Sequence, residues 1–287
     1  FSLIILGGIV SNLNYEIPFL QIICFFLIST IGIAHGALDN QKGYKILEYY
    51  GIKKKYFFYL SYILLSLLVV FFWIILPSFS LILFLLIASY HFGKEDSNFG
   101  IVKKRKFSYL FYLLKGSIVI LAPLAFHTAE TIKIFEILNV KLDLKNENIL
   151  LPFIVLSFIS NFFVINLKKN HWFVFADWLT IIILNILFSP FIAFTIYFCF
   201  LHSIRHSISL IYELNKNNFK RGLKEFTKKA LPLTIITGIL YLVSVFFVAN
   251  YYGWNDAILK VIFIGLASLT FPHILLEYLV EKNEKRN

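Results

Sequence analysis

Long apolar runs separated by short polar segments make up most of this chain. A run of roughly 17–25 apolar residues, at 1.5 Å per residue in a helix, is long enough to cross about 30 Å of hydrocarbon. The pattern therefore predicts an all-α fold, a polytopic transmembrane helix bundle of about ten spans. The predicted helix cores are Phe1–Leu13, Pro18–Leu38, Tyr56–Leu76, Phe79–Phe92, Phe107–Phe126, Leu150–Leu167, Trp172–Phe188, Pro190–Leu210, Leu231–Val248 and Ala257–Val280.

The composition agrees with lipid as the main solvent of the chain. Of its 287 residues, 59% are hydrophobic and only 15% are charged, whereas about a quarter of the residues in soluble domains are charged. A chain this apolar would expose an insoluble surface if it folded in water. We therefore expect a single integral-membrane domain over residues 1–287, with the lipid bilayer as its partner.

Basic residues gather in alternate loops of the predicted bundle. Segments Gln41–Lys55, Lys94–Lys106 and Asn215–Lys229 carry five, five and six Lys or Arg, against three Lys in His127–Asn148 on the opposite side. Because Lys and Arg are retained on the cytoplasmic side, both termini are expected in the cytoplasm, with the chain in the inner (plasma) membrane. This bias and attraction to anionic lipid account for the net charge of +11, so nucleic-acid binding is not expected.

Five of the seven histidines lie within or at the end of apolar runs, in the cytoplasmic half of the bilayer by this orientation: His35, His91, His202, His206 and His273. An imidazole in hydrocarbon loses its hydrogen bonds to water, so such residues usually serve a metal, a proton path or a ligand. The i, i+4 spacing of His202 and His206 puts both rings on one helix face, with Cβ atoms about 5–6 Å apart. Such a pair can bind one metal ion, and a buried metal centre is the leading hypothesis.

Acidic residues follow two of these histidines at short spacing. Asp39 lies one helical turn after His35, and Asp96 ends the segment that begins at His91. A metal-bound histidine usually donates its other N–H to a carboxylate or carbonyl. The alternatives are that Asp39 is an interfacial cap and that Asp96 is a loop charge. Both are candidates for an outer role at the metal site.

The last apolar run holds a histidine next to a proline. Pro272 is expected to kink the helix and free a carbonyl beside His273. Glu277, at i+4 of His273, is placed to pair with it; the alternative is a histidine hydrogen-bonded to the broken backbone. Asp177 is a lone carboxylate early in another run and is a candidate near the metal or on a substrate path. His127, at the end of a run, is expected to be solvated or interfacial.

Four motifs in this order resemble those of one known family: HGALD at 35–39, YHFGKED at 90–96, HSIRH at 202–206 and PH at 272–273. They are similar to the Brp/Blh family of microbial membrane β-carotene 15,15′-dioxygenases. The resemblance implies an oxidoreductase that uses O2 and Fe(2+) to cleave the central double bond of β-carotene. The products would be two retinal molecules, which supply retinal-accepting microbial rhodopsins. It further implies that the histidines matching the motifs ligate non-haem iron: His35, His91, His202 and His206.

Other classes of membrane protein stay open from the residues alone. A haem-binding protein needs histidines facing each other across the iron, which an HxxxH pair on one helix disfavours. An intramembrane multi-histidine divalent-metal transporter is expected to have several intramembrane carboxylates and access from both faces. A non-enzymatic carotenoid binder requires no cluster of histidines, and a di-iron desaturase needs more of them.

Overall fold

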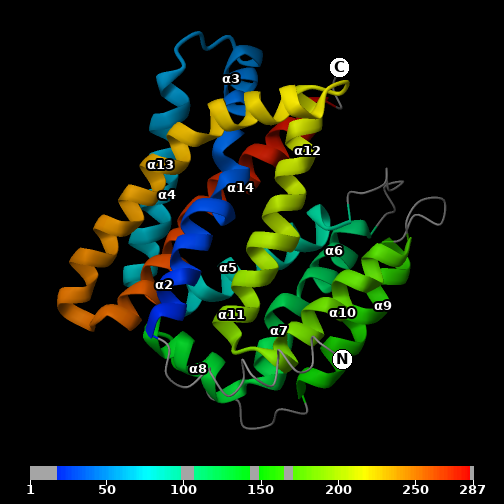
Figure 1. The fold of residues 1–287 in the computed structure, drawn as a ribbon, viewed down its shortest axis with the longest axis vertical. Helices are drawn as coiled ribbons and strands as arrows, with labels where there is room; N and C mark the ends of the chain where they lie inside the picture. Colours follow the sequence, from blue (N-terminus) through cyan, green and yellow to red (C-terminus); the bar gives the residue numbers. More distant parts are fainter. Residues whose placement is uncertain (1–17, 98–106, 143–148, 165–170, 285–287) are drawn as a thin grey trace. The chain divides into compact units, whose positions relative to one another are not determined.

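The computed structural model describes residues 18–97, 107–142, 149–164 and 171–284, and within these ranges it contains helices and no strand (Figure 1). The all-α fold class is therefore confirmed. The helices are α2 (Pro18–Leu27), the π-helix η1 (Ile28–Gly32), the 3-10 helix η2 (His35–Leu38), α3 (Asp39–Tyr49), α4 (Tyr56–Ile75), α5 (Pro77–Glu95), α6 (Ser108–Gly116), α7 (Ile118–Phe126), α8 (Thr128–Ile137), α9 (Leu150–Val164), α10 (His171–Leu187), α11 (Pro190–Ile196), the π-helix η4 (Tyr197–Ser203), α12 (Ile204–Leu214), α13 (Phe219–Tyr252) and α14 (Trp254–Glu284).

Seven helical stretches of the described residues are long and apolar enough to cross a membrane: Phe19–Tyr49, Tyr56–Ile75, Pro77–Glu95, Ser108–Phe126, Pro190–Leu214, Phe219–Tyr252 and Trp254–Asn283. Two shorter apolar helices, Leu150–Val164 and Phe173–Leu187, fall on two further predicted spans. The first predicted span, Phe1–Leu13, lies outside the described residues. A polytopic membrane protein is thus supported, and the count of ten spans stays a prediction.

The chain folds into two compact units. Unit 1 comprises Phe1–Leu27 and Ile82–His202, and unit 2 comprises Ile28–Leu81 and Ser203–Asn287. The chain passes from one unit to the other after Leu27, after Leu81 and after His202. The first passage lies between α2 and η1, where the backbone changes from α to π geometry, and the third lies inside the π-helix η4. The expectation of a single domain stays a prediction.

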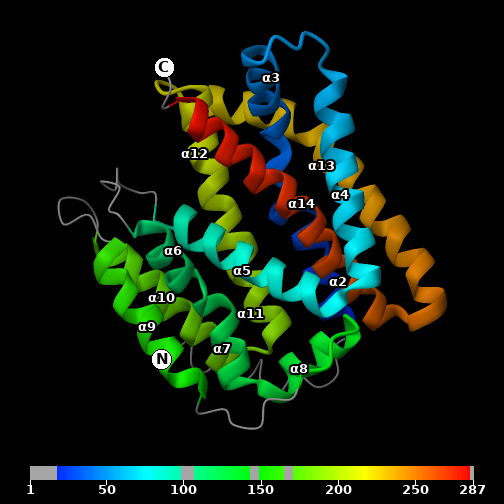
Figure 2. The ribbon, with the colours of Figure 1, turned by 180° about the vertical axis from the view of Figure 1, so that it is seen from behind.

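In unit 1, glycines allow the end of α5 to lie directly against α6 (Figure 2). A Cβ added to Gly93 would overlap the carbonyl group of Tyr112, and a Cβ added to Gly116 would overlap that of Ser89. Small residues at a helix crossing permit this close approach in membrane proteins. The crossing holds the last turns of α5, which carry His91, against the rest of unit 1. Further contacts join α6 to α9, α7 to α10 and α11 to α2.

In unit 2, the long helix α14 contacts α13, α4 and α3, and α12 contacts α13 (Figures 1 and 2). Most of the apolar side chains of α4 are exposed, and Trp73 is the residue of this helix that is buried. An apolar helix with an apolar exposed face is suited to contact with lipid chains. Unit 2 therefore presents hydrocarbon-compatible surface on one side while α14 carries polar residues toward its interior.

Three helices occur where the hydropathy pattern predicts loops. The basic segment 41–55 begins as helix α3, and the basic segment 215–229 holds the first turns of α13, capped by the Asn218 side chain on the Arg221 N–H. The predicted outer loop 127–148 begins with helix α8. Hydropathy separates lipid-soluble from water-soluble segments and does not distinguish a polar helix from a loop. The expected apolar runs are helical over most of their described residues.

Candidate metal centre

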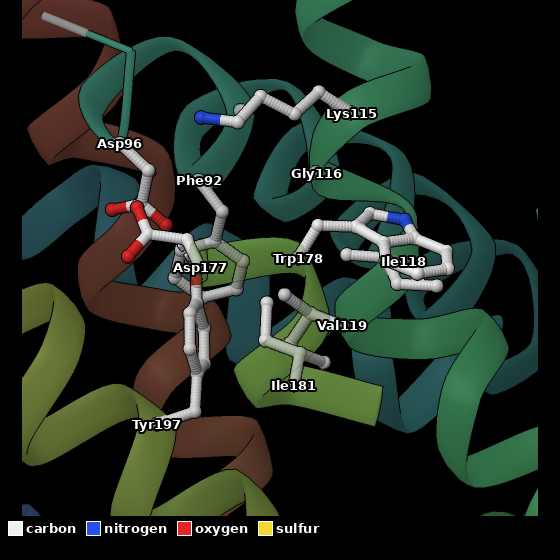
Figure 3. A pocket seen from close by; sticks show the side chains of 11 residues that line it. Phe92, Asp96, Lys115, Gly116, Ile118, Val119, Asp177, Trp178, Ile181 and Tyr197 are labelled. Atoms are coloured by element: carbon white, nitrogen blue, oxygen red, sulfur yellow. Dashed lines mark hydrogen bonds between the residues drawn. The ribbon is translucent and has the colours of Figure 1, made fainter. Parts of the chain in front are cut away.

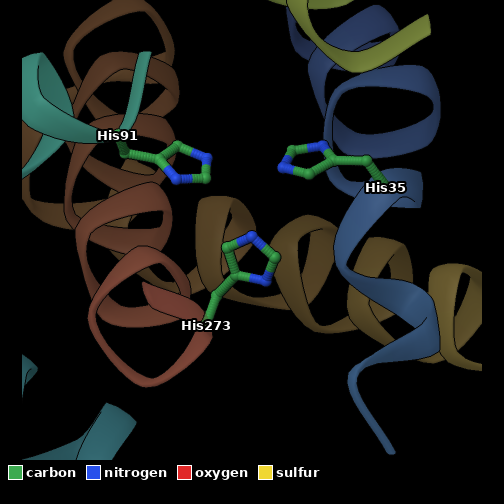
Figure 4. A group of neighbouring side chains, drawn as sticks. All are labelled: His35, His91 and His273. Atoms are coloured by element: carbon green, nitrogen blue, oxygen red, sulfur yellow. The ribbon is translucent and has the colours of Figure 1, made fainter. Parts of the chain in front are cut away.

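Three imidazoles gather in the interior of unit 2. The ring centroids of His35 and His206 lie 5.5 Å apart, those of His35 and His273 5.5 Å, and those of His206 and His273 6.3 Å. Figure 4 shows the His35 ring, from η2, and the His273 ring, from α14, turned toward each other; the third ring drawn belongs to unit 1. His35 and His273 are buried, with 9% and 4% of their surface exposed. Two predicted ligands and the additional candidate His273 therefore share one cluster.

Irregular helix geometry positions His35. The π-helix η1 ends at Gly32, and the tighter 3-10 helix η2 begins at His35. The Gly32 carbonyl accepts hydrogen bonds from Nδ1 of His35 at 2.7 Å and from Oγ of Ser203 at 2.8 Å. Because a carbonyl only accepts, the hydrogen of the neutral His35 ring is on Nδ1, and Nε2 keeps the lone pair that a metal needs. Short π segments occur often at functional sites.

A carboxylate on another helix holds His273. Nδ1 of His273 lies 2.9 and 2.8 Å from the two oxygens of Asp39, which is buried. The hydroxyl of Tyr62, on α4, donates to Oδ2 of Asp39 at 3.0 Å. The spacing in the sequence placed Asp39 one turn from His35, but the described contacts assign it to His273 instead. The structure therefore favours the histidine-partner interpretation of Asp39 over a simple cap.

Glu277 forms the outer edge of the same group. Its Oε1 lies 3.7 Å from Nε2 of His273, as the i, i+4 spacing predicts, and 3.3 Å from Nζ of Lys42. The side chain of Lys42 is 22% exposed, whereas the side chain of Glu277 is 10% exposed. An ion pair of this kind lets a carboxylate stay charged at the edge of an apolar interior. Glu277 thus connects His273 to a partly exposed cation.

Two imidazoles meet in unit 1. The ring centroids of His91, near the end of α5, and His202, in η4, lie 5.2 Å apart. Asp96 follows α5, and its Oδ1 lies 3.3 Å from Nδ1 of His202, while its Oδ2 accepts the hydroxyl of Tyr197 at 2.7 Å. With 6% of its surface exposed, Asp96 is not a solvated loop charge. Its described imidazole contact is with His202, although in the sequence it follows His91.

A pocket lined by both apolar and charged residues adjoins this pair within unit 1. Its lining includes Asp96, Lys115, Asp177, Trp178 and Tyr197. Figure 3 shows the carboxylates of Asp96 and Asp177 near each other, with the Lys115 side chain above them. All three charged residues are buried, and Nζ of Lys115 donates to Oγ of Ser97 at 3.0 Å. Charges inside membrane helices are costly and are kept together by their mutual attraction. Asp177 therefore belongs to the surroundings of Asp96.

The hydrogen bond and ion pair described for His127 involve neither histidine cluster. Its Nε2 donates to the carbonyl of Asn185 at 2.7 Å, and its Nδ1 lies 3.6 Å from Glu130. Its side chain is 24% exposed, so it is half-buried at the junction of α7 and α8. These contacts agree with an interfacial, structural histidine.

Two residues of the site were missed by the sequence reasoning. Tyr62 and Tyr197 each donate a hydrogen bond to a carboxylate that contacts a histidine. The chain contains 16 tyrosines, many of them in apolar runs. Neither spacing nor a motif distinguishes these two, because each meets its carboxylate from a different element.

The donors suit a divalent first-row metal. Imidazole is a ligand that Fe²⁺, Zn²⁺ and Cu²⁺ accept, and the His35 and His273 rings of unit 2 are buried. The Nδ1 atoms of His35, His202 and His273 are held by a carbonyl or a carboxylate. Partners of this kind fix ring orientation and raise the basicity of the opposite nitrogen. The histidines present therefore fit a divalent first-row metal.

Comparisons with known proteins identify the family of this chain. The chain matches the sequence model of a family described as "Beta-carotene 15,15'-dioxygenase" over residues 26–281. It is 28% identical over 264 residues to a protein named "Beta-carotene 15,15'-dioxygenase" from uncultured marine bacterium 66A03, covering 91% of this chain and 94% of that protein. No solved structure matches the chain. The match spans the motifs that suggested the resemblance, and it confirms that this chain belongs to the β-carotene 15,15′-dioxygenase family of carotenoid-cleaving dioxygenases.

Proposed function

We propose that this protein cleaves the central 15,15′ double bond of β-carotene with O2 and forms two molecules of all-trans retinal. The observation that carries the proposal is the three-imidazole cluster of His35, His206 and His273, of which His35 and His273 are buried, in a chain of this family. A solely carotenoid-binding protein requires no such cluster. The retinal formed would supply the chromophore of microbial rhodopsins.

We propose Fe²⁺ as the metal. The family resemblance assigns four histidines as its ligands: His35, His91, His202 and His206. The geometry of unit 2 adds His273, because its ring is as close to His35 as the His206 ring is, at 5.5 Å. When bound to neutral imidazoles, Fe²⁺ supplies open coordination positions and the redox chemistry that O2 activation requires.

The protein residues orient the ligands and keep the site dry. The Asp39 carboxylate and the Gly32 carbonyl hold the hydrogens of His273 and His35 on Nδ1, so that Nε2 is the ligand atom. Exposed apolar side chains on α4 and α13 offer a surface from which a lipid-soluble polyene can approach without crossing water. Exclusion of water protects reactive intermediates from side reactions.

We also propose an orientation with both termini in the cytoplasm of the inner membrane and the metal site in its cytoplasmic half. The basic residues of segments 41–55, 94–106 and 215–229 support it. A reporter that is active only in the cytoplasm, fused after residue 287, tests this orientation. An inactive reporter on a well-expressed fusion would reverse it.

Expression in bacterial cells that make β-carotene tests the function. The cells would carry the parent chain, His206→Ala, or the control His127→Ala, whose imidazole contacts the carbonyl of Asn185 rather than the cluster. Retinal and protein-bound iron are measured together by chromatography and elemental analysis. The parent and His127→Ala should form retinal and retain iron, and His206→Ala should lose both.

Two results would contradict the proposal. A parent chain that binds iron but leaves β-carotene intact would require another substrate. A parent that forms retinal without any bound metal would refute the metal centre while leaving the cleavage activity in place.

A further inference from the structure

We propose that two tyrosines, Tyr62 in unit 2 and Tyr197 in unit 1, are positioning residues of the metal centre. Each donates its hydroxyl hydrogen to a buried aspartate that holds Nδ1 of a histidine. The inference rests on the proposed metal-dependent function and goes beyond it, because it assigns a role to residues that bear no motif. Among the described residues, each unit contains one such Tyr–Asp–His arrangement.

In unit 2, the arrangement joins three helices. Tyr62 comes from α4, Asp39 from α3 and His273 from α14. The hydroxyl of Tyr62 lies 3.0 Å from Oδ2 of Asp39 and 3.3 Å from the carbonyl of Leu269, the shorter distance being to the carboxylate. Pro272, next to His273, has no N–H to contribute to the helix, so the backbone around His273 is less constrained than in a regular helix. A bond from a third helix compensates for this local freedom.

In unit 1, the π-helix η4 is what makes the arrangement feasible. Tyr197 and His202 are five residues apart, and at 3.6 residues per turn they would point roughly 140° apart around an α-helix. A π-helix closes its hydrogen bonds from i to i+5, which brings such a pair to one face. Their ring centroids lie 6.3 Å apart, and both side chains reach the carboxylate of Asp96. The departure from α geometry thus has a specific result at this site.

The direction of the hydrogen bonds supports a common role. An ionised carboxylate only accepts, so the tyrosine O–H and the histidine Nδ1–H must both donate to it. The tyrosine bond keeps the aspartate oriented as an acceptor, and the aspartate keeps the histidine hydrogen on Nδ1. The lone pair of the same ring then stays on Nε2, where a metal can bind it. Each tyrosine acts on the metal through its aspartate and does not itself contact the metal.

The test measures metal affinity in purified, full-length protein. Metal-free parent, Tyr62→Phe and Tyr197→Phe are titrated with Co²⁺ against a competing chelator, and the visible absorption of bound Co²⁺ is recorded. Tyr241→Phe is the matched control, because Tyr241 is buried in unit 2 and its hydroxyl makes no hydrogen bond among the described residues. Each Phe variant is also combined with the Asn variant of the aspartate in its own unit.

We expect each of the two Phe variants to bind Co²⁺ about 10-fold more weakly, the lower end of what loss of an outer partner costs. The absorption of bound Co²⁺ should change with the altered ring orientation, and Tyr241→Phe should match the parent. The double variants should bind no more weakly than Asp39→Asn or Asp96→Asn alone, because each tyrosine acts through its aspartate.

Several results would overturn the proposal. These are parent affinity and spectrum in Tyr62→Phe and Tyr197→Phe, an equal loss in Tyr241→Phe, or losses that add in the double variants. A Phe variant that no longer folds without metal would make its tyrosine a structural residue and would also overturn it. Retinal formation by the parent is scored separately, so failure of carotene cleavage is distinguishable from failure of the tyrosine assignment.

Discussion

The bond between Asp39 and His273 gives the sharpest quantitative prediction. Both carboxylate oxygens lie within 2.9 Å of Nδ1, and the two residues are buried, so solvent does not replace the interaction when it is lost. A hydrogen bond to a charged group contributes about 1.5–3 kcal/mol, against about 1 kcal/mol for a neutral one. Because about 1.4 kcal/mol is a factor of ten in an equilibrium constant, complete loss corresponds to about 10- to 100-fold in metal affinity. Measured losses of outer partners fall in the same range.

Two substitutions separate the charge from the hydrogen bond. Asp39→Asn keeps an acceptor oxygen of the same size and loses the charge, so we expect metal affinity to fall about 10-fold. Asp39→Ala removes the acceptor as well and should approach 100-fold, at about 2.8 kcal/mol. Both are measured by chelator competition with Fe²⁺ under anaerobic conditions, with retinal formation as a second readout.

Asn40→Ala is the matched control for this series. Asn40 is the next residue in the chain, and its side chain contacts the hydroxyl of Tyr59 at 3.3 Å rather than a histidine. Its removal should leave metal affinity unchanged. Parent affinity in both Asp39 variants, or the same loss in Asn40→Ala, would refute the assignment of Asp39 to the metal centre.

Three further predictions follow from the clusters and from the helix crossing. His273→Ala should lower iron affinity by more than the 10- to 100-fold of an outer partner, measured by chelator competition; parent affinity would exclude His273 as a ligand. Gly93→Ala should lower the unfolding temperature in detergent, because the new Cβ meets the Tyr112 carbonyl and overpacking costs about 1–3 kcal/mol. Gly238→Ala, whose Cβ would lie 3.5 Å from a backbone oxygen, should be tolerated, and equal unfolding temperatures for the two would contradict the crossing. Removing the metal with a chelator should destabilise the parent by about 2.7 kcal/mol when free metal had been 100 times Kd; an unchanged unfolding temperature would indicate that no metal was bound.

The apolar runs were sufficient to predict the all-α fold and the long apolar helices of the described residues. Crossing hydrocarbon requires that backbone groups be paired within the segment, so a long apolar run has few alternatives to a helix. The same runs did not reveal the polar helix α3 or the first turns of α13, since basic residues mark a loop and a polar helix equally. The apolar composition of a segment therefore predicts its insertion into a membrane. The residues at which a helix begins and ends depend instead on local capping, such as that by the Asn218 side chain.

The chain by itself determined which residue types were available for the site. Five histidines were candidates because an imidazole in an apolar run is costly and usually has a functional role: His35, His91, His202, His206 and His273. The order of the motifs indicated the family that the comparisons confirm.

Only the tertiary structure decided which partners these residues have. Spacing along a helix placed Asp39 beside His35, but its described bonds are to His273, 234 positions away. Asp96 follows His91 in the sequence, where an outer role at the metal site and a loop charge both stayed open, and it is buried against His202. Helical spacing predicts only neighbours on one helix, whereas each of these bonds joins side chains from elements far apart in the chain. Hydrogen-bond partners of this kind are set by how the helices pack against one another. The sequence of a single apolar run does not determine that packing.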